Sequence, residues 1–168
     1  MPCRVCVIAV AALTLGAFPA SGDRRLLEHA PTQDEIWGQR DRAQYDDGGA
    51  FSSKMSDHGV IPRVAELREF ILMHWREHRR GYVTFTSSYI DSATTWHFFV
   101  EPNDTGEWHI TLLAFLSWYG VPGPARWETF DQPDITSVQR EKPTEEDFHG
   151  GDDVLVLRDI EGKQVLRL

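Results

Sequence analysis

The sequence predicts an α+β domain in which one amphipathic helix packs on an antiparallel sheet of about five strands. Two observations lead to this prediction. Residues 62–80 place apolar side chains at helical spacing, and residues 82–116 contain three runs rich in β-branched and aromatic residues with turn residues between them. A long loop and a C-terminal hairpin over residues 154–168 complete the expected order of helix, three-strand meander, loop and hairpin.

The N-terminus, residues 1–22, has the layout of a secretory signal peptide. Arg4 forms a short basic region, the next 14 residues carry no charge, and Ala20 and Gly22 are the small residues expected before a cleavage site. A spanning helix needs roughly 20 apolar residues, so we expect cleavage after Gly22 rather than a retained membrane anchor. The sequence therefore predicts export, to the periplasm or as a secreted protein.

The cysteine count and the charge exclude several classes of protein. Cys3 and Cys6 both lie in the predicted signal peptide, so the mature chain would have no cysteine. That excludes a disulfide scaffold, a cysteine nucleophile and a cysteine zinc site. The mature chain would carry 16 basic and 26 acidic side chains. Nucleic acids and anionic membranes repel an acidic protein, so we expect no nucleic-acid partner and no stable membrane insertion after cleavage.

Residues 23–61 show no sustained hydrophobic period and are interrupted by Ala30-Pro31 and by the run from Asp46 to Gly49. Such a stretch buries too little apolar surface to offset the entropy lost on ordering. We therefore predict a flexible linker over residues 23–61, with a short helical turn around residues 34–43. Residues 62–168 would then form a single α+β domain.

The expected helix over residues 62–80 has signals at both ends. Pro62 suits the first helical position, arginines fall late, and Gly81 is the expected stop. Steps of about 100° place seven side chains on one face: Val64, Leu67, Phe70, Ile71, His74, Trp75 and His78. We expect this face to cover the sheet.

Three strands are expected over residues 82–90, 93–101 and 107–116, and their alternation gives the sheet one apolar and one polar face. The polar face would carry Thr84, Thr86, Ser88, Thr95, His97, His109 and Thr111. Residues 119–135 are interrupted by proline and glycine and are expected to form an irregular loop. A short edge strand is expected over residues 136–142.

The string His74-Trp75-Arg76-Glu77-His78 matches the H-x-x-E-H motif of the inverted zinc metallopeptidases. That resemblance implies zinc ligands at His74 and His78 and a general base at Glu77. The match covers five residues, and no downstream helix is expected that could supply the third ligand of a catalytic zinc. We therefore expect no metal and no cofactor, and the zinc-dependent hydrolase is the alternative.

Two places are candidate binding sites for an unknown protein or small-molecule partner. His97 and His109 are expected as diagonal neighbours on the polar sheet face, which is otherwise an ordinary solvated surface. Trp127 and Phe130 lie in the proline-rich loop, where they either contact a partner or pin the loop over the core. The sequence therefore predicts an exported, non-catalytic binding or interaction module.

Overall fold

A computed structural model describes residues 24–53, 64–88, 91–119, 126–144 and 153–168. Its strands are β1 (Arg24–Leu27), β2 (Asp46–Ser53), β3 (Gly81–Ser88), β4 (Ser92–Pro102), β5 (Trp108–Trp118), β6 (Arg126–Phe130), β7 (Ser137–Glu141), β8 (Val154–Arg158) and β9 (Gln164–Arg167). Its helices are α1 (Gln33–Trp37), the short 3-10 helix η1 (Arg42–Gln44) and α2 (Val64–Glu77). The predicted signal peptide lies outside the described residues.

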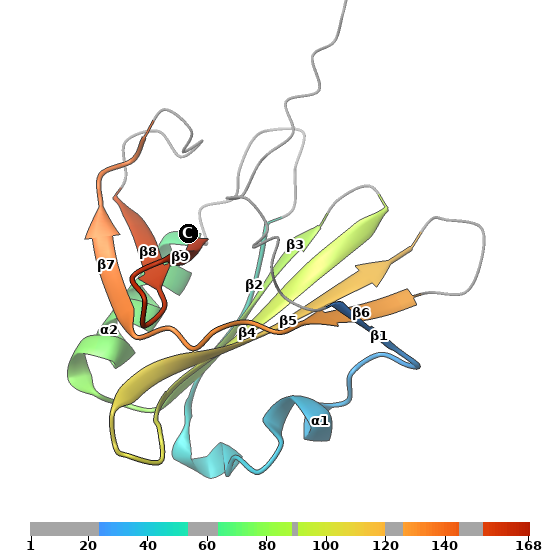
Figure 1. The fold of residues 1–168 in the computed structure, drawn as a ribbon, viewed down its shortest axis with the longest axis horizontal. Helices are drawn as coiled ribbons and strands as arrows, with labels where there is room; N and C mark the ends of the chain where they lie inside the picture. Colours follow the sequence, from blue (N-terminus) through green and yellow to red (C-terminus); the bar gives the residue numbers. More distant parts are fainter. Residues whose placement is uncertain (1–23, 54–63, 89–90, 120–125, 145–152) are drawn as a thin grey trace, which may run out of the picture.

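The predicted fold class is wrong, because the protein is not one helix on a single sheet of about five strands. The described strands form a six-stranded sheet, in the order β1-β6-β5-β4-β3-β2, and a separate three-stranded sheet, β7-β8-β9 (Figure 1). The expected meander, β3 to β5, lies in the larger sheet. Both edges of that sheet come from the segment expected to be a linker, because β1 pairs with β6 and β2 pairs with β3.

The edge strand β2 pairs with β3 in parallel, and α2 supplies the crossover that this pairing requires. The register shifts between Asp47 and Ala50, so the two intervening glycines form an irregularity in the strand. Gly49 has a φ of 80°, a conformation that favours glycine. A Cβ on Gly48 would lie 2.7 Å from the ring of Phe70 on α2. The glycines that indicated a linker therefore shape an edge strand under a helix.

The main core lies between one face of the larger sheet, α2 and the three-stranded sheet. It consists of Val64, Leu67, Ile71, Leu72, Val83, Phe85, Phe98, Val100, Ile110, Leu112, Ile135, Val138, Leu155, Leu157, Val165 and Leu168. Full burial of each large aliphatic or aromatic side chain contributes about 1.5–3 kcal/mol. The amphipathic helix and the apolar face of β3 to β5 are therefore confirmed, but the C-terminal strands cover this face as well.

A second apolar cluster lies on the opposite face of the larger sheet, next to α1. It consists of Ile36, Trp37, Tyr45, Tyr82, Phe99 and Phe115. Trp37 meets Phe99 edge to face, with 5.2 Å between the ring centroids. A capping box between Thr32 and Glu35 holds the first turn of α1. The sheet face that was expected to be polar and solvated is therefore covered around Phe99.

Candidate functional site

His97 lies in the second cluster and not on an open surface. The residue is 6% exposed, and its Nδ1 forms a hydrogen bond of 2.8 Å with the Tyr82 hydroxyl. Its ring packs edge to face on Phe115, with 5.5 Å between the ring centroids. Burial lowers the pKa of His97 to about 4, so the ring is neutral at pH 7. A neutral, enclosed histidine packs the core and does not meet a ligand in solution.

His109 is not a diagonal neighbour of His97 as predicted. In the β4–β5 register, His97 lies opposite Leu113 and His109 lies opposite Glu101, because the turn between the strands begins only after the Pro102–Trp108 pair. His109 Nε2 lies 3.0 Å from the Thr111 hydroxyl and 4.0 Å from Oδ1 of Asp134. The two histidines therefore belong to different places on the sheet.

The hydrogen bonds around Thr111 determine which nitrogen of His109 carries a proton. The Thr111 hydroxyl donates to Oε1 of Glu101 at 2.8 Å. A hydroxyl has one proton, so its oxygen accepts from Nε2–H of His109. In the neutral ring, Nδ1 is then an acceptor, and it is buried without a partner among the described residues. An unsatisfied buried acceptor costs about 1–3 kcal/mol.

Glu101 is a buried anchor for the chain segment that follows α1. Arg40 donates to both carboxylate oxygens at 2.7 to 3.1 Å, and the Tyr45 hydroxyl donates to Oε2. Burial raises the pKa of Glu101, but the hydrogen bonds from Arg40, Tyr45 and Thr111 outweigh it and lower the pKa overall. Burial and the Glu101 carboxylate raise the pKa of Tyr45 to about 12. Both oxygen atoms of the Glu101 carboxylate therefore accept hydrogen bonds from protein side chains.

Trp127 and Phe130 lie in strand β6 and not in an irregular loop. Trp127 is paired with Ser117, and Phe130 is paired with Ala114. Phe130 is buried and packs in a small cluster with Ala114 and Leu116. Two aromatic residues and the β-branched Thr129 in the string Trp127-Glu128-Thr129-Phe130 were the signal for a strand. The surrounding prolines and glycines hid that signal, and the pair forms no joint contact surface.

The histidines of the H-x-x-E-H string have different partners. His74 Nδ1 donates to the Phe70 carbonyl at 2.9 Å, and Nε2 lies 3.2 Å from Oδ2 of Asp46. His78 follows the last residue of α2, Glu77, with a φ of 51°, and stacks on Trp108 with 5.3 Å between the ring centroids. Within the described segments, no group of three or more histidine, cysteine, aspartate or glutamate side chains is arranged to hold a metal ion.

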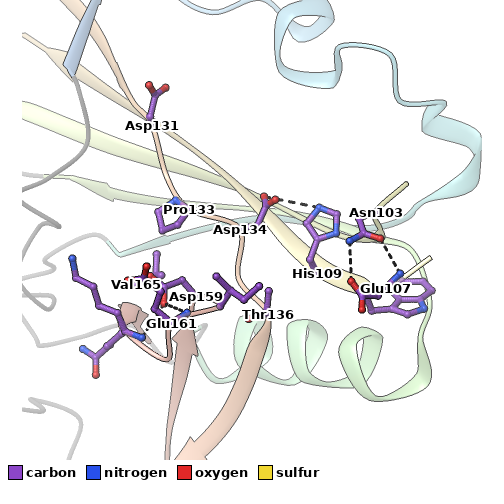
Figure 2. Close-up of a pocket in the computed structure, with 14 residues that line it drawn as sticks. Asn103, Glu107, His109, Asp131, Pro133, Asp134, Thr136, Asp159, Glu161 and Val165 are labelled. Carbon is purple, nitrogen blue, oxygen red and sulfur yellow. Dashed lines mark hydrogen bonds and ion pairs between the residues drawn. The ribbon is translucent and has the colours of Figure 1, made fainter. Parts of the chain in front are cut away.

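A groove of about 830 Å³ lies between the two sheets (Figure 2). Three segments line it: the β4–β5 turn with the start of β5, the link from β6 to β7, and the β8–β9 turn with the start of β9. Backbone hydrogen bonds of 2.8 and 3.0 Å between Ile110 and Ile135 hold the link against β5. His109 is the one predicted site residue that lines this groove.

The groove is acidic. Its lining contains five carboxylates and one ammonium group, those of Glu107, Asp131, Asp134, Asp159, Glu161 and Lys163. Asp159 accepts the backbone N–H groups of Glu161 and Lys163 and so holds the β8–β9 turn, and Asp131 pairs with Arg25 at 2.5 Å. The side chain of Asp134 is 63% exposed, and Glu161 is exposed as well. These two carboxylates can meet a ligand from solution.

Apolar side chains share the groove with these carboxylates. Trp108, Pro133 and Val165 line it, and Ile160 on the β8–β9 turn is 86% exposed. Sequence reasoning missed this site because its residues come from three segments that lie far apart in the chain. The pairing of Ile110 with Ile135 brings two of these segments together, and no local pattern predicts it.

Comparisons of the chain with protein-family models, curated proteins and solved structures give no match. Among the segments that the structure describes, there is no helix of sufficient length and hydrophobicity to cross a membrane. A functional hypothesis therefore depends on the groove and on the chemistry of its walls.

Proposed function

We propose that the protein is a small, non-catalytic binding module that acts after export, with the groove between the two sheets as its binding site. The observation that supports this most is the composition of the groove. It combines the apolar side chains of Trp108 and Ile160 with the exposed carboxylates of Asp134 and Glu161. Its volume of about 830 Å³ lies within the range of ligand clefts, about 300–1,000 Å³.

The buried polar side chains form hydrogen bonds with other groups of the protein, and this favours a binding function over a catalytic one. His97 is enclosed beside Tyr82, and Glu101 is held by Arg40. His74 is buried and hydrogen-bonded within the helix. An acid–base residue must reach the proton that it transfers, and these three groups face protein partners instead.

Export is supported by the N-terminal sequence. Arg4, the uncharged run after it and the small residues up to Gly22 follow the order of a signal peptide. The chain from Asp23 onward has no cysteine, so its fold does not depend on disulfide formation after export.

The test is a titration of the isotope-labelled chain without residues 1–22, followed by amide chemical shifts. The probes are capped hexapeptides of cationic, anionic and neutral composition and a neutral oligosaccharide. We expect at least one probe to shift the amides of Trp108, His109 and Asp134 together. Shifts confined to other surfaces, or no shift with any probe, would contradict the groove as a binding site.

Two exposed apolar residues provide a matched pair of variants. Ile160, 86% exposed, lines the groove, whereas Leu26, 72% exposed, lies on β1 outside it. We expect Ile160→Ala to weaken binding of the active probe and Leu26→Ala to leave it unchanged. Equal effects of the two substitutions would show that binding does not occur in the groove.

A further inference from the structure

We propose that the occupant of the groove is an extended peptide segment of a partner protein that carries lysine or arginine side chains and lies along the edge of β9 at Gln164 and Val165. This inference rests on the proposed function, because it names the ligand class of the same groove. Two observations support it: the placement of the carboxylates and the edge that β9 presents to the groove at Gln164 and Val165.

The carboxylates are distributed around the groove and do not converge on one point. Glu107 lies at the β4–β5 turn, Asp134 on the link from β6 to β7, and Glu161 on the β8–β9 turn (Figure 2). A metal ion needs several ligands around one centre, and no such group occurs in the described part of the chain. Separated carboxylates complement a ligand with separated positive charges. Such a ligand is a long cation and not a metal ion.

The edge of β9 favours a peptide over a small polyamine. Among the described strands β9 pairs with β8 alone, and its residues Gln164 and Val165 line the groove. An edge strand presents backbone N–H and C=O groups to which an extended chain can add. A polyamine could meet the carboxylates but has no backbone to pair with this edge. A peptide uses both features at once.

The probe is a capped octapeptide of alternating lysine and valine, compared with its glutamate–valine counterpart by isothermal titration calorimetry. We expect binding of the lysine peptide only, with affinity that falls as the NaCl concentration rises, because salt screens exposed charges. Asp134→Asn and Glu161→Gln should each weaken binding about two- to five-fold, the range for exposed ion pairs. The matched control is Glu66→Gln on α2, outside the groove, which should leave binding unchanged.

The remaining experiments test whether the groove prefers a positively charged ligand and whether the ligand's peptide backbone contributes to binding. Lys163→Gln should strengthen binding of the lysine peptide, because it removes the one ammonium group of the lining. A lysine peptide with alternate N-methylated residues should bind at least ten-fold more weakly. Spermidine that binds as tightly as the lysine peptide, or an N-methylated peptide of equal affinity, would overturn the inference.

The failure of this inference is distinguishable from failure of the proposed function. If the glutamate or neutral peptide shifts the amides of Trp108 and His109 and the lysine peptide does not, the ligand class is wrong and the groove remains the binding site. If no probe shifts these amides, both are wrong. The substituted carboxylates are exposed, so thermal unfolding of each variant should match that of the parent chain.

Discussion

The imidazole of His74 on α2 lies 3.2 Å from the carboxylate of Asp46 at the start of β2, and this contact ties the crossover helix to the edge strand. The other ring nitrogen faces the Phe70 carbonyl. Both partners are oxygen atoms that accept hydrogen bonds, so the ring lies between two acceptors. The hydrogen bond from His74, with Arg79 beside it, holds the pKa of Asp46 below its usual range. His74, the first histidine of the H-x-x-E-H string, therefore has a structural role here.

Replacement of His74 by alanine should lower the free energy of unfolding by about 2–4 kcal/mol, because it leaves a cavity and removes two hydrogen bonds. His78→Ala is the matched control from the same string. Its ring is exposed and stacks on Trp108, so its loss should cost less than about 1 kcal/mol. Urea unfolding measures both values. Equal losses, or stabilisation of the parent chain by equimolar zinc, would contradict this assignment.

Gly81→Ala should destabilise the protein through His74. A Cβ at position 81 would lie 2.7 Å from Cδ2 of the His74 ring, and that ring is 1% exposed and enclosed. The expected loss is about 1–3 kcal/mol, typical of overpacking. In the double variant with His74→Ala the added methyl group meets a cavity, so the two losses should not add. Additive losses in thermal unfolding would show that the ring is not the obstacle.

The pH dependence of stability should contain a contribution from His97. The pKa of this group is about 4 when folded and near 6.5 when unfolded, so the unfolded chain binds its proton first. Stability from this group is fully present above pH 6.5 and is lost as pH falls toward 4, by about 1–3 kcal/mol. His97→Gln keeps a hydrogen-bonding side chain beside Tyr82 and removes the titration. Urea unfolding at pH 7 and pH 4.5 should show a smaller loss in this variant, and an identical loss would count against the prediction.

Glu101→Gln should loosen the segment that covers the second cluster. The substitution leaves Arg40, whose side chain is 24% exposed, without its charged partner, and the expected loss is about 2–4 kcal/mol. Amide hydrogen exchange should increase at Trp37 and Tyr45, which pack beneath this anchor. Asp34→Asn removes a fully exposed partner of Arg42 and should leave exchange unchanged. Unchanged exchange in Glu101→Gln would show that the apolar contacts alone hold the segment.

Limited proteolysis should distinguish the observed edge strands from a flexible linker. Arg40 is engaged with Glu101, and Arg42 lies in η1 over the Trp37 ring, with 5.2 Å between the guanidinium carbon and the ring centroid. We therefore expect trypsin to leave the bonds after both arginines intact in the folded protein. Rapid cleavage after Arg40, detected by mass spectrometry, would restore the linker interpretation.

The strength of local patterns explains how much of the fold the sequence could predict. Helix α2 and strands β3 to β5 have long, regular periods, and they were found. Strand β1 has four residues, of which Leu26 is exposed, so no buried face marks it. Strand β2 contains Gly48 and Gly49, whose role depends on Phe70 from another element. A pattern of neighbouring residues cannot predict a contact with a residue from another element.

The candidate site was harder to predict than the fold, because burial decides which polar residue is available. His97 and His109 alternate to the same face, yet the cover provided by α1 encloses His97, whereas His109 reaches the groove. Asp134 and Glu161 belong to no motif. The pairing of Ile110 with Ile135 places Asp134 beside β5, and Glu161 lines the same groove from the β8–β9 turn. Of the four candidate binding residues, His109 lies in the groove, and its surroundings there were not predicted.

The pairing of β1 with β6 also has a kinetic consequence. Arg25 and Asp131, which form an ion pair at this edge, are 106 positions apart. Contacts of such large separation pay their loop-closure entropy before they contribute stability, and they slow folding. A chain delivered with its N-terminus first cannot close this sheet until residue 130 has emerged. If the chain is exported as proposed, the larger sheet is expected to close only after residue 130 has left the translocation channel.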